Sequence, residues 1–97
     1  MDFHLIYSKE AIADLEAILD EITADNPAAA FRFGNALHEH ISLLKLFPRM
    51  GTPVRDRPRV RTLTHSPILV YYVVNMARSS VEILHLRHGA RSEPEWL

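Results

Sequence analysis

The chain has 97 residues, of which 47% are hydrophobic, and its net charge is −1 at neutral pH. This length suits one domain, residues 1–97, with a modest core. The lack of cysteine excludes a disulfide framework, a zinc–thiolate site and a cysteine nucleophile, and it fits a reducing compartment.

The charges are distributed unevenly along the chain. Residues 1–48 carry three basic and eight acidic side chains, whereas residues 49–97 carry eight arginines and four acidic residues. Guanidinium groups match phosphate and carboxylate alike. The basic half therefore indicates recognition of an anion, either nucleic acid or an acidic protein segment, and solvated loop charge is the alternative interpretation.

No segment has the pattern of a signal peptide or a membrane span. The N-terminus lacks a basic region ahead of an apolar core. The longest apolar run, residues 68–74, is far shorter than the roughly 18 residues that a span needs. We expect a cytoplasmic protein without a membrane partner.

The first half of the chain predicts a strand followed by two helices. Residues 3–7 are mostly apolar and end where Ser8 can cap a helix. From residue 9 to about residue 24, apolar side chains recur at helical spacing, with acidic residues mostly on the other face. An Asn–Pro pair at 26–27 ends this helix and begins a second one, which runs to about residue 47. So short a connection makes the two helices antiparallel.

The second half predicts three strands after an irregular loop at residues 47–58. Residues 59–64 and 81–87 alternate in polarity, whereas residues 68–74 are apolar throughout, as is typical of an interior strand. Without a crossover helix these strands form an antiparallel meander, with a turn at residues 75–80. The expected fold class is α+β, with an N-terminal strand and an antiparallel helical hairpin packed on an antiparallel sheet that ends in this meander.

The six histidines do not indicate a metal site. His38 and His40 are two residues apart on a predicted helix, whereas a helical metal pair usually has a spacing of three or four. His85 and His88 have opposite parity on a strand and would face apart. The three glycines form no phosphate-binding loop, and no Ser-His-Asp triad stands out. We expect no metal and no organic cofactor.

Several motifs resemble one protein family when they are taken in order. They are YSKEAIADL at residues 7–15, FPRMG at 47–51, YYVV at 71–74 and VEILHLRHGAR at 81–91. Together they span about the whole chain and resemble the RelE/ParE toxin superfamily of bacterial type II toxin–antitoxin systems. The resemblance implies a helical hairpin packed on an antiparallel sheet, which periodicity predicts as well.

This superfamily has two functional branches. RelE-like members cut messenger RNA on the ribosome, using basic residues to hold phosphate and often a tyrosine or histidine to transfer a proton. ParE-like members, among them plasmid stabilisation toxins, have no known catalytic constellation and poison DNA gyrase. The chain resembles the ParE branch more, because the nuclease pattern has an arginine where this chain has Ile68. That pattern also has a C-terminal tyrosine where this chain has Trp96 and Leu97, neither of which transfers a proton.

The ribonuclease alternative still has candidate residues. Arg59, Arg61 and Arg91 match basic positions of RelE-like nucleases and would stabilise a pentavalent phosphate. His88 would serve as acid or base. Pairing of Arg59 and Arg61 with Glu82 or with helix carboxylates is an equally weighted structural alternative.

Binding to an antitoxin or to a target is the other role for such residues. Antitoxins typically wrap their toxins, so the resemblance also implies a groove with apolar and basic side chains. A buried aromatic residue is more often plain core, and only one of Tyr71 and Tyr72 can face the helices. The binding candidates are Arg59, Arg61, Tyr72, Arg87, His88, Arg91 and Trp96.

We predict a gyrase-inhibiting toxin, which is not an enzyme, neutralised by a cognate antitoxin. The first alternative is an endoribonuclease that acts on ribosome-bound messenger RNA. The second is a non-toxic relative that only binds an antitoxin.

Overall fold

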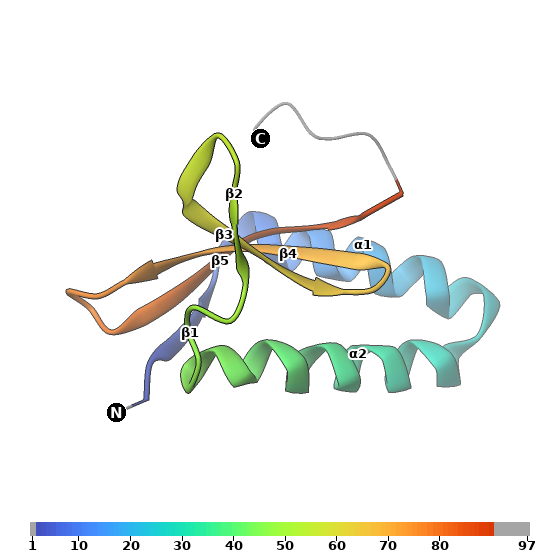
Figure 1. Cartoon of the computed structure of the whole chain (residues 1–97). Coiled ribbons are helices and arrows are strands. Elements are labelled where there is room, and N and C mark those ends of the chain that lie inside the picture. Colours follow the sequence, from blue (N-terminus) through green and yellow to red (C-terminus); the bar gives the residue numbers. More distant parts are fainter. Residues whose placement is uncertain (1, 91–97) are drawn as a thin grey trace.

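The computed structural model describes residues 2–90, which form two α-helices packed on a five-stranded sheet (Figure 1). The elements in chain order are β1 (His4–Tyr7), α1 (Lys9–Asp25), α2 (Pro27–Ser42), the 3-10 helix η1 (Leu43–Lys45), β2 (Thr52–Val54), β3 (Arg57–His65), β4 (Ile68–Asn75) and β5 (Ser80–His88). This arrangement confirms the predicted α+β class, in which a strand and a helical hairpin precede a meander of three strands.

The sheet has the strand order β1-β5-β4-β3-β2 and is mostly antiparallel. Strands β3, β4 and β5 form the predicted meander. Strand β1 runs parallel to β5, because no tight turn joins these two strands and most of the chain lies between them. The sheet is therefore antiparallel except at its first strand.

Both helices begin at the predicted caps. The Ser8 hydroxyl accepts a hydrogen bond from the Ala11 amide, and the Asn26 side chain accepts one from the Ala29 amide. Pro27 follows at the first turn of α2, where a missing N–H costs nothing. Helix α2 ends at Ser42, earlier than predicted, because the last turn before the proline at 48 tightens into the 3-10 helix η1.

One strand lies inside the region that the sequence predicts to be a loop. Strand β2 pairs antiparallel with β3, with Thr52 opposite Thr62 and Pro53 opposite Arg61. The prediction of an unbroken loop at residues 47–58 is therefore wrong. Periodicity missed β2 because the strand has three residues, and because proline is tolerated only at an edge such as this one.

The core lies between the helices and one face of the sheet. Its largest fully buried side chain is Tyr72 on β4. In Figure 1, α2 runs beneath the sheet and α1 lies further back, along β5. The buried core cluster consists of Ala11, Leu37, Ile41, Leu44, Leu63, Ile68, Val70, Tyr72, Val81, Ile83 and Leu86.

Side chains of α1 and its cap close the part of the β5 edge that β1 does not reach. Strand β1 pairs only as far as Ile83. Beyond it, the Ser8 hydroxyl donates to the Leu84 carbonyl over 2.8 Å, and the Asp14 carboxylate accepts from the Leu86 amide over 3.0 Å. The same carboxylate oxygen lies 3.2 Å from Nδ1 of His85. These contacts satisfy backbone groups that would otherwise form an open sheet edge.

Candidate functional site

Tyr72 belongs to the core and not to an exposed groove. Its side chain has no exposed surface. Its hydroxyl donates to the Pro48 carbonyl over 2.8 Å and accepts from the Gly51 amide over 2.9 Å. Burial raises the pKa of Tyr72 above its usual value, and the hydrogen bond from Gly51 and the charge of Arg61 partly oppose that shift. The expectation that Tyr72 contacts a partner is therefore corrected, because its side chain ties the loop before β2 to the sheet.

Arg61 supports the same loop. One of its terminal nitrogens donates to the Gly51 carbonyl over 2.8 Å and to the Arg49 carbonyl over 3.3 Å. The predicted alternative of a pair with Glu82 is not what the structure shows, because Glu82 accepts hydrogen bonds from Asn75 and Ser80. The side chain of Arg61 therefore donates hydrogen bonds to backbone carbonyls of the loop.

Arg59 is exposed on β3, two residues before Arg61. Its neighbours at 55 and 57 are exposed arginines as well. These cations lie on and beside the hairpin that projects from the sheet on the side away from α2 (Figure 1). An exposed run of guanidinium groups suits contact with an anionic surface.

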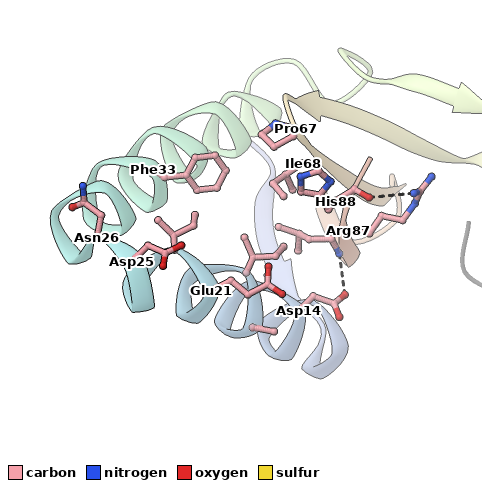
Figure 2. A pocket seen from close by; sticks show the side chains of 13 residues that line it. Asp14, Glu21, Asp25, Asn26, Phe33, Pro67, Ile68, Arg87 and His88 are labelled. Carbon is pink, nitrogen blue, oxygen red and sulfur yellow. Dashed lines mark hydrogen bonds between the residues drawn. The ribbon is translucent and has the colours of Figure 1, made fainter. Parts of the chain in front are cut away.

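Arg87 packs on Tyr71. Its Nε donates to the Tyr71 hydroxyl over 3.0 Å, and its guanidinium carbon lies 5.8 Å from the centre of the ring. A terminal nitrogen also donates to the His88 carbonyl over 3.4 Å. Figure 2 shows the guanidinium pointing away from the neighbouring cleft.

His88 lies at the mouth of a cleft of about 600 Å³ between α1, α2 and the ends of β4 and β5 (Figure 2). Ile18 and Ile22 of α1, Phe33 of α2 and Ile68 of β4 are among its apolar walls. Its acidic lining residues, Asp14, Glu21 and Asp25, all come from α1. The cleft therefore combines an apolar interior with negative charge along one helix.

The structure does not bring His88 together with the arginines of β3. Arg61 pairs with Tyr72, which pairs with Ile83, so Arg61 lies level with Ile83. His88 pairs with Ile68, which lies four residues from Tyr72 along β4, and this corresponds to about 13 Å at about 3.3 Å per residue. Arg59 is further away still. The two remaining candidates, Arg91 and Trp96, lie outside the described residues.

Two contacts that involve histidines were not predicted from the sequence. His85 faces Asp14, which is 71 residues away in sequence, and His40 of α2 faces His65 of β3. Burial, and secondly the neighbouring His40, lower the pKa of His65. Spacing along one helix or one strand reveals neither contact, because both join different elements. Within residues 2–90, no group of three or more His, Cys, Asp or Glu is placed to hold a metal ion.

The fold is that of toxins from type II toxin–antitoxin systems. The P. aeruginosa chromosomal ParDE system contains a chain that is 26% identical, with a TM-score of 0.75, covering 89% of this chain and 95% of that one. The RelBE2 toxin–antitoxin complex of Mycobacterium tuberculosis contains a chain at 20% identity and a TM-score of 0.63, covering 91% and 99%. The isolated E. coli RelE toxin follows at 17% identity and a TM-score of 0.60, covering 94% and 88%.

Sequence comparison identifies the family within this fold. The model of the ParE toxin of the parDE type II toxin–antitoxin system matches residues 5–93. The chain therefore belongs to the ParE toxin family, which confirms the resemblance inferred from its motifs. No curated protein sequence matches it significantly. Across the described part of the chain, no helix is both long and apolar enough to traverse a bilayer.

Proposed function

We propose that this ParE-family toxin inhibits DNA gyrase and is held inactive by a cognate antitoxin. The observation that carries the proposal is the separation of the β3 arginines from His88 in a chain of this family. A ribonuclease needs its phosphate-binding cations and its proton donor around one scissile bond. The described residues instead have Arg61 and His88 about 13 Å apart along the strand direction. A gyrase target also places the protein in the cytoplasm.

The antitoxin is the partner that suits the cleft of Figure 2. Its apolar walls would accept the apolar face of an amphipathic helix, which is a common mode of peptide recognition. Asp14, Glu21 and Asp25 would attract basic residues at the margin of that helix. The ParDE and RelBE structures named above come from toxin–antitoxin systems, and they support a partner of this kind.

The exposed arginines of β3 remain candidates for contact with the target. Arg59 is the clearest of them, because it is exposed and because no described hydrogen bond engages its guanidinium. Arg61 is less suited, since its side chain already donates to the loop carbonyls. DNA gyrase, the proposed target, acts on DNA, and exposed cations suit a surface that carries phosphate.

A supercoiling assay with purified gyrase tests the proposal directly. We expect the toxin to inhibit supercoiling or to trap cleaved DNA, and to leave ribosome-bound messenger RNA intact in a parallel reaction. Arg59→Ala should weaken inhibition, whereas Arg78→Ala, which removes an exposed arginine from the β4–β5 turn, is the matched control. Cleaved message with normal supercoiling would replace the proposal with the ribonuclease alternative. Unimpaired growth of cells that make folded toxin without antitoxin would support a non-toxic relative.

A further inference from the structure

Two histidines from distant parts of the chain meet where α2 crosses the β3–β4 hairpin. His40 lies near the end of α2, and His65 is the last residue of β3. Their Nδ1 atoms are 2.8 Å apart and their ring centres are 5.1 Å apart, and the second distance is close to the first plus the two ring radii. The two nitrogens therefore point at each other and share one N–H···N hydrogen bond.

We propose that this hydrogen bond is an acid-sensitive contact, which holds α2 to the β3–β4 hairpin at neutral pH and breaks when both rings are protonated. A neutral imidazole has one N–H donor and one nitrogen that accepts, so one ring donates from Nδ1 and the other accepts there. A first added proton binds Nε2 of the donor ring, and the hydrogen bond remains. A second proton has to bind the accepting Nδ1, after which two N–H groups and two positive charges would face each other.

His65 is the ring that takes the second proton. Burial, and secondly the neighbouring His40, lower its pKa, because both make the charged form less favourable. Phe33 contributes to that burial, since its ring meets that of His65 edge to face, with the centres 5.5 Å apart and the planes at 71°. His65 is therefore the acceptor of the pair, and His40 is the donor.

The charge that acts on His65 from the elements packed around it is that of His40. The other ring that meets it from α2 is Phe33, and its register partner on β4 is Ile68, so both of these neighbours are apolar. His88 of β5 lies one strand beyond Ile68, at about 10 Å from His65 for strands about 4.8 Å apart.

Other charged residues surround the pair without bonding to it. They lie on the exposed surface of the same helical segment or across the cleft, and they are Arg32 and Glu39 of α2, Lys45 of η1, and Glu21 and Asp25 of α1. Within residues 2–90, the ion pair of a histidine with a carboxylate is that of His85 with Asp14. No described carboxylate therefore pairs with either ring and offsets a second positive charge.

The histidine pair adjoins the cleft of Figure 2. Phe33, which packs on His65, faces Pro67 and Ile68, which follow His65 in the chain, across that cleft. Repulsion within the doubly protonated pair would push α2 away from the hairpin, so the cleft should widen in acid. This inference depends neither on gyrase as the target nor on an antitoxin as the occupant of the cleft.

NMR of the imidazole nitrogens during a pH titration of the full chain tests the proposal. At neutral pH we expect a ¹⁵N–¹⁵N coupling between the Nδ1 atoms of His40 and His65, which disappears in acid as His65 takes up its proton. The amide of Gln can donate to a neutral imidazole or accept from a charged one, so the titration midpoint of His65 should rise in His40→Gln. His38→Gln, which removes an exposed histidine from the same helix, is the matched control and should leave that midpoint unchanged.

Stability should fall over the same pH range. Because the pKa of His65 is lowered in the folded state, the unfolded chain binds more protons once the pH falls below the ordinary value of 6.5. The stabilising contribution is thus fully present above pH 6.5 and is lost as the pH falls through the lower folded pKa. In urea denaturation, the wild type and His38→Gln should lose more stability between about pH 7.5 and about pH 5 than His40→Gln does.

Two outcomes with these variants would overturn the proposal. One is a His65 midpoint that does not rise in His40→Gln, or that rises equally in His38→Gln, which would indicate a general effect of surface charge. The other is an equal loss of stability in acid for the wild type and His40→Gln. Should His40→Gln fail to fold, the wild type decides alone, because no coupling at neutral pH, or a coupling that persists after His65 is protonated, rules out the acid-sensitive contact.

Discussion

Removing the hydroxyl of Tyr72 should substantially lower the free energy of unfolding of the protein. Tyr72→Phe keeps the buried ring but deletes the oxygen that accepts from the Gly51 amide and donates to the Pro48 carbonyl. A typical hydrogen bond contributes about 0.5–1.5 kcal/mol, and a buried donor that is left unpaired costs about 1–3 kcal/mol. Gly51 is buried, so its amide would find no water in place of the hydroxyl.

We therefore expect the free energy of unfolding to fall by about 2–3 kcal/mol. Urea denaturation followed by circular dichroism measures this change, and the m value should stay constant because the exposed surface on unfolding is unaltered. Tyr71→Phe is the comparison variant, because it deletes a hydroxyl on the same strand that accepts from Arg87. A loss below about 0.5 kcal/mol for Tyr72→Phe would refute this reasoning.

The same hydroxyl gives a pH dependence of known sign. Burial raises the pKa of Tyr72 above its ordinary value of 10.0, so the folded state favours the neutral phenol. Its contribution to stability is fully present below pH 10 and is lost as the pH rises through the higher folded pKa. The wild type should lose stability above about pH 10 more steeply than Tyr72→Phe, and equal slopes in urea titrations would contradict the assignment.

Four further substitutions test separate parts of the protein. In Gly51→Ala, the new Cβ would lie 2.7 Å from the Thr62 carbonyl and from the Tyr72 hydroxyl, so Tm should fall by about 10 °C or more, as expected for a loss above about 2 kcal/mol. Gly34→Ala, whose Cβ meets only the Leu19 side chain at 3.5 Å or more, should raise the stability of its helix by up to about 1 kcal/mol. Asp14→Ala leaves the Leu86 amide at the sheet edge without its acceptor, so hydrogen exchange at that amide should accelerate while the amides inside β4 stay protected. Asp25→Lys should weaken binding of a basic antitoxin helix without a change in Tm, and an unchanged Kd would argue against docking in the cleft.

Local patterns in the sequence predicted the elements whose causes are local. Ser8 and Asn26 lie one residue before their helices, and the apolar run that begins at Ile68 stands out in any window. Strand β2 escaped detection because its three residues, one of them Pro53, become a strand only by pairing with β3. A short edge strand of this kind carries little signal of its own.

The candidate site could be predicted only in part, because its geometry depends on contacts between distant residues. The arginines of β3 were recognised by type, but the hydrogen bonds from Arg61 to the loop arise from the pairing of β2 with β3. The contact between His40 and His65 requires α2 to cross the end of β3. Parity and helical spacing describe one element at a time, so they place side chains on a face without revealing which residues face them.

The hydrogen bonds of Arg61 affect how loss-of-toxicity mutations should be interpreted. Its guanidinium and the Tyr72 hydroxyl hold the same loop, at Gly51 and its neighbours. Selection of surviving cells would recover substitutions at both residues, although neither needs to touch a target. Such survivors should contain little folded toxin, whereas survivors with changes at Arg59 should contain normal amounts of inactive toxin. Protein abundance therefore separates residues that maintain the fold from residues that contact the proposed target.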